Sequence, residues 1–388
     1  MPPTRGFPAH RPFFLLAQLS AVIGGLVWVL PVGRPVALHV SWLVFGMGGA
    51  AVAGYLLTAL PSWTGGVRAP ASTVWVLVLL WLVVRAAGLG AATGAGFTLA
   101  SLAFHATLTM VLTRPVVRLR LWHRLPLALA PGALGAAEVA VGAGGHGAHG
   151  DGSFAPLAAV LLFAALISLV GGSAIPAFVG AALRSSVATR PTAVVEPALV
   201  AGAAVLVLVG AEPGAAVLLL AAALLQALRL RQWSPARVWR HPGAAMMVLA
   251  WLWLVLGLVL LGLALLTASA STHEAAAVGT ALHALTMGAM GSMIYAFTAR
   301  ATMLRMPGRL VPTRLQQVGF LLVLLSPLPR LIHWPDAPTG NAVAVLAWCL
   351  GWLCLLTRTV RLLRDPAPWP ALSAAKDEQP GRALTDGP

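Results

Sequence analysis

The sequence predicts an all-α, polytopic membrane protein with about twelve transmembrane helices. Hydrophobic residues make up 59% of its 388 residues and charged residues only 9%, and apolar runs of bilayer length recur from end to end. The expected spans cover residues 12–31, 40–61, 71–90, 96–116, 125–145, 154–183, 192–211, 214–230, 243–267, 275–299, 313–334 and 340–363. The sixth span is longer than a bilayer requires, and Pro176 is the expected place for a break.

The distribution of basic residues predicts the topology. The chain has 25 Lys and Arg against 10 Asp and Glu, a net charge of +15. With a cytoplasmic N-terminus, all the basic residues but Arg34, Arg85 and Arg330 fall on the cytoplasmic side. This asymmetry is typical of a bacterial inner membrane protein with both termini inside. The basic residues therefore indicate how the chain is oriented in the lipid bilayer, its expected partner. They give no reason to expect nucleic acid as a partner. No protein partner can be identified.

The chain is expected to form one helical transmembrane domain over residues 1–364, followed by a disordered cytoplasmic tail over 365–388. That tail is polar, rich in proline and without periodicity. No internal repeat is visible, and no P-loop, GxSxG or HExxH motif is present. Chemistry, if the protein performs any, must take place between helices.

The tenth span holds the most informative residue, a histidine at membrane depth. His283, Met287, Met290 and Ile294 follow a helical spacing and share one face. An ionisable side chain inside a membrane is a candidate functional residue, and imidazole with thioether suits haem iron or copper. The alternative is a hydrogen-bonded histidine among methionines that fill space.

Other polar residues lie at comparable depth. His105 in the fourth span is expected at the depth of His283, and His39 opens the second span. Glu138 in the fifth span should be protonated, paired or bound to an ion. Arg85 and Arg330 could hold anionic groups such as haem propionates, or reach to the interface. Buried polar contacts or interfacial placement are the alternatives for the two histidines.

The glycine-rich loop at 142–153 carries further candidate ligands. His146, His149 and Asp151 could collect a divalent metal. Ordering so many glycines costs entropy, which favours a flexible linker.

Two motifs of this chain resemble those of a known family. HALTMGAMGSMIYAFTAR at 283–300 is similar to the HALTxGAxGxMIxAxxTR stretch of NnrS proteins, and GYLLTALPSWTG at 54–65 is similar to their GFLLTAVPNWTG. RPFFLL at 11–16, WLVVR ending at Arg85, and GGSAIPAF at 171–178 follow in the expected order. The resemblance implies a twelve-span bacterial inner membrane protein that contains haem and copper and acts in the nitric oxide response and in protection against nitrosative stress during denitrification.

The chain departs from the family pattern at several positions that the resemblance associates with ligands. Where the family reads WHAHE, Ser41 and Trp42 replace the second histidine and the glutamate. Ser173 stands in place of an arginine, and Val248 and Met306 stand where further histidines are expected. His39 and His283 are what is left of the family pattern, with Arg85 as a possible support.

The leading hypothesis is a membrane haem or metal protein of nitric oxide and denitrification physiology. His283 is its principal ligand and His39 its second. Together they could be the axial ligands of haem, and a vacant or weakly held position would admit a small ligand such as nitric oxide. Met287 and Glu138 are further metal candidates, and His105 or Glu138 could replace the lost ligands. The alternative is a transporter or membrane scaffold that keeps the fold but lacks the cofactor.

Overall fold

Helices account for nearly all of the described chain, as expected for an apolar sequence whose backbone polar groups must be satisfied within lipid. The computed structural model describes residues 7–373 except 31, 33–34, 91–93, 144–153, 185–193, 268–271, 307–308, 333–336 and 368–369. The predicted tail at 365–388 is therefore described only at 365–367 and 370–373, and its disorder stays a prediction. The candidate ligands of the loop at 142–153 lie outside the described residues.

The helices before the middle of the chain are α1 (His10–Leu26), α2 (Pro35–Val40), the π-helix η1 (Ser41–Met47), α3 (Gly48–Thr64), α4 (Ala71–Gly90), α5 (Ala95–Arg118), the 3-10 helix η2 (Trp122–Arg124), α6 (Leu125–Ala143) and α7 (Ala155–Leu183). The later elements are α8 (Val195–Leu208), α9 (Glu212–Trp233), the 3-10 helix η3 (Ala236–Arg240), α10 (Pro242–Leu266), α11 (Thr272–His283), the π-helix η4 (Ala284–Gly291), α12 (Ser292–Arg300), strands β1 (Leu304–Met306) and β2 (Arg309–Val311), α13 (Arg314–Leu325), α14 (Leu328–Leu331) and α15 (Ala337–Arg361).

The all-α, multi-pass prediction is confirmed. Among the described residues, nine helical segments are long and apolar enough to cross a membrane. The helices at the other three predicted spans are shorter: α1 has 17 residues, α8 has 14 and α13 has 12. The count of twelve spans and the cytoplasmic termini therefore stay predictions. The break expected at Pro176 is wrong, because α7 continues through this residue.

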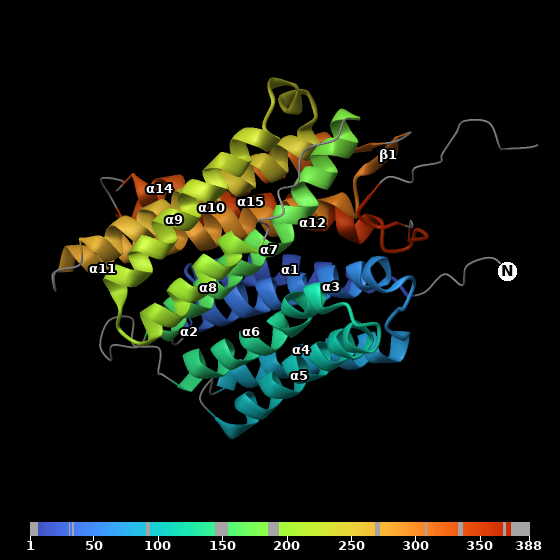
Figure 1. Cartoon of the computed structure of the whole chain (residues 1–388), viewed down its shortest axis with the longest axis horizontal. Coiled ribbons are helices and arrows are strands. Elements are labelled where there is room, and N and C mark those ends of the chain that lie inside the picture. The colour runs from blue at the N-terminus through green and yellow to red at the C-terminus, as the bar shows by residue number, and fades with distance from the viewer. Residues whose placement is uncertain are drawn as a thin grey trace, which may run out of the picture.

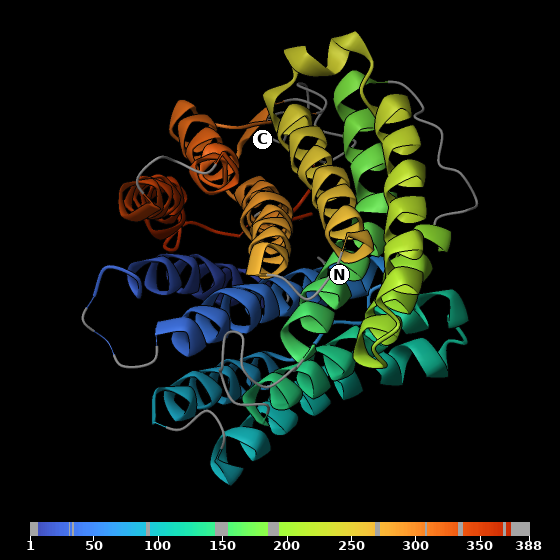
Figure 2. The same ribbon diagram turned by 90° about the vertical axis from the view of Figure 1, so that its left-hand side faces the viewer.

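Helix α7 lies between two groups of helices. Figures 1 and 2 show α1 to α6 on one side of it and α8 to α13 on the other. It contacts α6 in the first group and α8, α10 and η4 in the second. In the most apolar stretch of α7, 72% of the residues are buried. The corresponding share is 39% in each of α4, α5, α9 and α15, whose outer faces are apolar and exposed, as contact with lipid requires. Helix α7 is therefore a buried element through which the two groups are joined.

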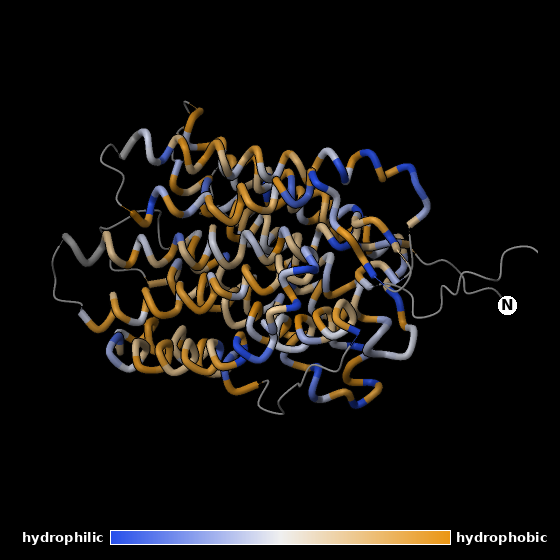
Figure 3. The backbone as a smooth tube through the Cα atoms, turned by 90° about the horizontal axis from the view of Figure 1, so that it is seen from above, coloured by the Kyte–Doolittle hydropathy of each residue, from blue (hydrophilic) through white to orange (hydrophobic). Residues whose placement is uncertain are grey.

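The hydrophilic positions gather mainly at one end of the bundle, which is on the right in Figure 3. The start of α1 and the end of α15 meet at this end, since Arg11 Nη1 donates to Leu363 O at 3.1 Å. The two ends of the helical domain thus lie on the same side, as an even number of crossings requires.

Candidate functional site

Two π-helical segments mark the candidate site, and each begins within two residues of one of the predicted histidines. His39 lies two residues before η1, and His283 is the last residue of α11 before η4. Short π-helical insertions are rare and often occur at functional sites, because the widened turn shifts side chains and backbone carbonyls out of the regular helical position. Both histidine-bearing helices therefore depart from regular geometry within two residues of the imidazole.

His39 and His283 line one cavity of about 120 Å³. Three methionines from the π-helical segments, Met47, Met287 and Met290, line it as well, and Trp348 and residues of α7 contribute to its wall. The glycines beside these methionines permit the close packing. A Cβ added at Gly48 would lie 2.6 Å from Phe163 and 2.7 Å from Met290. The structure therefore confirms no ligand, but it brings two imidazoles and three thioethers to the same space.

The hydrogen bonds of the two imidazoles involve Nδ1 in the part of the chain described. His283 Nδ1 lies 2.7 Å from Gly279 O, so this nitrogen carries the proton and Nε2 keeps its lone pair. That is the tautomer of a metal-binding histidine, whose other nitrogen usually donates to a carbonyl or carboxylate. His39 Nδ1 lies 3.0 Å from Gly24 O and 2.7 Å from Trp28 Nε1. The indole N–H of Trp28 can only donate, so its bond needs a lone pair on His39 Nδ1. A metal bound at His39 Nε2 needs the proton on Nδ1. His39 would then donate to Gly24 O and lose the hydrogen bond from Trp28.

Helix α4 holds η1 in place from the side away from His283. Arg85 donates through Nη1 to the carbonyl of Ser41 and, at 2.9 Å, to its hydroxyl. One turn earlier, Trp81 Nε1 donates to Gly46 O at 3.3 Å. Both acceptors belong to the π-helix, so two side chains of α4 bind the backbone of this segment. Arg85 is thus connected to His39 through the backbone that follows it.

A buried ion pair anchors this arginine. Arg85 Nη2 contacts Glu138 Oε1, and the two side chains are 4% and 2% exposed. Ser101 donates to Glu138 Oε2 at 2.7 Å, and His105 Nε2 lies 3.2 Å from the same oxygen. The cluster joins α4, α5 and α6, and it satisfies the expectation that a carboxyl group at this depth is paired.

The predicted site residues therefore fall into two sets. His39, His283 and Met287 line the cavity, whereas Arg85, His105 and Glu138 do not. Within the described ranges, no group of three His, Cys, Asp or Glu side chains could hold a metal ion. The idea that His105 or Glu138 replaces a lost ligand beside His283 stays a prediction: in this structure neither residue lines the cavity of His283, and Arg85, Ser101 and His105 contact the Glu138 carboxylate. The contacts of Arg85 in this structure are likewise with Glu138 and with Ser41 of η1, and not with a haem propionate.

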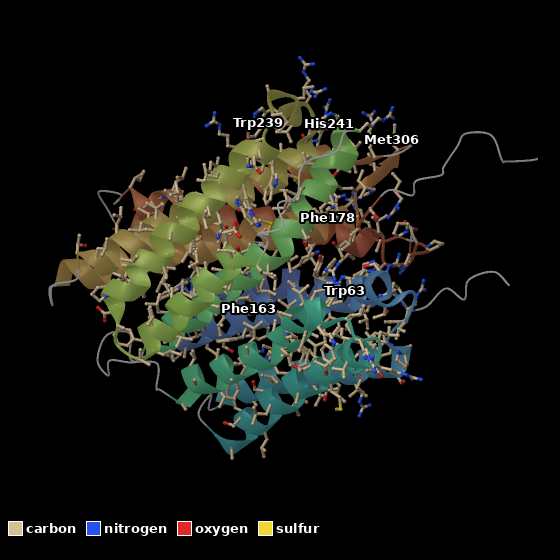
Figure 4. The ribbon with its side chains drawn as sticks, in the orientation of Figure 1. Trp63, Phe163, Phe178, Trp239, His241 and Met306 are labelled. Carbon is tan, nitrogen blue, oxygen red and sulfur yellow. The ribbon has the colours of Figure 1, made fainter. Side chains whose placement is uncertain are left out.

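The positions where the chain departs from the family pattern have structural roles of their own. Ser41 accepts from Arg85, and the Trp42 ring packs edge-on against Trp81 with centroids 6.2 Å apart. Val248 is buried in the core, and Ser173 donates to Val170 O of its own helix. Met306 is exposed on β1, at the edge of the molecule in Figure 4. None of these residues lines the cavity.

A short motif that occurs twice in the sequence points to Met47 as a site residue, although a search for long repeats misses it. The pattern MGxxxxxxYxxTA occurs at residues 47–59 and again at 287–299. Each copy includes the end of a π-helical segment and the start of the α-helix that follows. The expectation of no internal repeat is therefore wrong for this short motif, whose two copies meet at the cavity through Met47 and Met287.

The comparison with known families agrees with this arrangement. The model of the NnrS protein family matches residues 8–366, which is nearly the whole described domain. No curated relative matches the chain. The matched range includes both histidines, both π-helical segments and the buried ion pair, so the chain belongs to the NnrS family.

Proposed function

We propose that this chain is a metal-binding protein of the bacterial inner membrane that acts in the nitric oxide response, with its centre held by His39 and His283. The observation that carries the proposal is the cavity shared by the two imidazoles, each with Nδ1 beside a backbone carbonyl. Such a bond leaves Nε2 as the ligating atom. The proposal includes protection against nitrosative stress during denitrification, as the family resemblance implies.

Copper fits the residues of this cavity. Imidazole and thioether are the donors that copper(I) accepts, and Met47, Met287 and Met290 supply thioethers beside the two histidines. A copper ion so held supplies redox chemistry and an affinity for small ligands. The protein's contribution is to orient the imidazoles and to keep the surroundings apolar, since the polar residues of the Arg85 cluster lie outside the cavity wall.

Haem does not fit the cavity as it stands. Its volume of about 120 Å³ is well below the roughly 300 Å³ at which pockets for drug-sized ligands begin. Haem between His39 and His283 would therefore require the helices around α7 to separate.

A second, apolar cavity suits a diatomic ligand. It measures about 70 Å³ and is lined by α3, α7, η4 and α12, with Met290 common to both cavities. Phe163 contributes to its wall where α7 meets the N-terminal group of helices (Figure 4). Small uncharged molecules such as nitric oxide partition into apolar surroundings, so this space offers a route from the bilayer interior towards the histidines.

Metal analysis of the purified protein tests the proposal. After expression in cells supplied with copper and haem precursors, we expect stoichiometric copper, and a change of the optical spectrum when nitric oxide is added. His283→Ala and His39→Ala should each lose the metal, whereas His241→Ala, on the loop before α10 (Figure 4), should retain it. A protein with neither copper nor iron would contradict the proposal. A Soret band in the optical spectrum would show that the bound group is haem and not copper.

The buried cluster favours a second candidate function, a proton-coupled carrier. His105 lines an open cavity of about 390 Å³ while its Nε2 faces Glu138, so it connects solvent or lipid with a buried carboxylate. Its Nδ1 is buried without a partner among the described residues. If this function is correct, Glu138→Gln should abolish pH-dependent accumulation of the carried solute in vesicles. Unchanged accumulation would exclude Glu138 from the coupling.

A further inference from the structure

A separate cavity lies at the arginine-rich end of the bundle. Its volume is about 240 Å³, and it is enclosed by the start of α1, the turn after α12, the end of α15 and residues 362–366. It shares no lining residue with the cavity of His39 and His283. A function here is therefore independent of the proposed metal centre.

Two polar side chains in the wall have no partner among the described residues. Gln18 on α1 is fully buried, and neither its amide nitrogen nor its amide oxygen makes a hydrogen bond. Thr359 on α15 is 6% exposed, and its hydroxyl is also unpartnered. Both line the cavity. Buried polar groups are rarely left unsatisfied in native proteins, so their common position indicates a polar occupant.

The charge of the wall indicates that this occupant is an anion. Arg11, Arg305 and Arg358 come from three separate segments and all line the cavity, whereas Asp365 is the acidic residue among the described residues that line it. Arg358 Nε donates to Thr302 O at 3.2 Å, which holds this guanidinium at the wall that Thr359 also lines. Three guanidinium groups against one carboxylate leave an excess of positive charge.

Arginines in and near the wall donate to backbone carbonyls of the chain after α15. Arg11 donates from Nη1 to Leu363 O at 3.1 Å and from Nη2 to Asp365 O at 2.5 Å. Arg305 Nη2 donates to Pro370 O at 2.8 Å, and Arg300 Nε to Leu372 O at 2.9 Å. This part of the chain is the red loop beside α12 and β1 in Figure 1. Arg11 and Arg305 thus bind the segment after α15 as well as adding positive charge to the wall.

From these contacts we infer that the cavity binds a phosphate group. Arg358, the Gln18 amide and the Thr359 hydroxyl are the direct donors, and Arg11 and Arg305 add positive charge and bind the segment after α15. A phosphate presents enough oxygens for donors that arrive from two helices and suits guanidinium recognition, whereas a carboxylate has two oxygens. The group belongs either to an anionic lipid head group or to a soluble phosphate compound.

Two binding measurements on the full-length protein test this inference and separate the two sources. In the first, protein delipidated in an uncharged detergent is titrated with inorganic phosphate by calorimetry. In the second, protein in nanodiscs of phosphatidylcholine, with or without phosphatidylglycerol, is examined by native mass spectrometry for retained phosphatidylglycerol. We expect saturable binding in at least one arm: binding only of inorganic phosphate indicates a soluble ligand, and retention of phosphatidylglycerol indicates a lipid.

Variants assign the binding to this cavity. Arg358→Gln and Gln18→Leu should each weaken it about tenfold or more, the effect of losing a hydrogen bond to a charged group. Arg361→Gln is the matched control, because Arg361 is exposed on the same helix and does not line the cavity. If Gln18→Leu fails to fold, Arg358→Gln decides, since that side chain is half-buried. Absence of saturable binding in both arms, or wild-type affinity in Arg358→Gln, would overturn the inference.

Discussion

Replacing Arg85 by methionine should destabilise the protein severely, because the change leaves a buried carboxylate without its counter-charge. Arg85 and Glu138 are 4% and 2% exposed, and after the substitution Glu138 keeps only Ser101 at 2.7 Å and His105 at 3.2 Å as described partners. Removing one partner of a buried ion pair costs about 3–5 kcal/mol. At about 1.4 kcal/mol per tenfold change, the folded-to-unfolded ratio should fall at least a hundredfold.

The double variant Arg85→Met/Glu138→Leu separates the charge effect from lost packing. It removes both charges, so it should be more stable than the single variant even though it carries more changes. The assay is unfolding by SDS in mixed micelles, followed by tryptophan fluorescence. Arg118→Met, at the exposed end of α5, is the control and should change the free energy of unfolding by no more than about 0.5 kcal/mol. A loss below about 1 kcal/mol for Arg85→Met, or additive losses in the double variant, would refute the reasoning.

Three further predictions concern other contacts. Trp28→Phe should raise copper affinity about two- to tenfold in an equilibrium competition assay, because the indole competes for His39 Nδ1; weaker binding would contradict this. Gly319→Ala should cost about 1–3 kcal/mol in SDS unfolding, since an added Cβ would lie 2.8 Å from Gly351 O, whereas Gly49→Ala has open space and should be tolerated. Thr313→Ala removes the capping box of α13 and should cost about 0.5–2 kcal/mol, with no loss expected for Ser62→Ala.

The sequence predicts the helices in the right order because lipid allows few alternatives to an apolar helix. Their lengths are predicted less well. Helices α8 and α13 are shorter than the apolar runs that contain them, since composition does not reveal where a helix ends. Pro176 lies inside α7, as proline can in a membrane helix that is surrounded by other helices, and the sequence of one segment does not reveal those surroundings.

The candidate site is predictable in its residues but not in their grouping. His39, His283, Arg85 and Glu138 stand out because polar residues at membrane depth are costly. Which of them meet depends on packing between helices distant in sequence, and no spacing rule along one helix provides that information. Amino-acid composition does not predict the π-helical segments either. The sequence alone therefore did not indicate that Ser41 would accept a hydrogen bond from Arg85.

The central claim is that His39 and His283 hold a metal together, and the copper content of three proteins tests it most directly. Wild-type protein, His283→Ala and His39→Ala are expressed in cells supplied with copper and measured by elemental mass spectrometry after purification. The account predicts stoichiometric copper in the wild type and loss of copper in both variants. Copper retained at the wild-type level in either variant would contradict the claim that the two imidazoles share one centre.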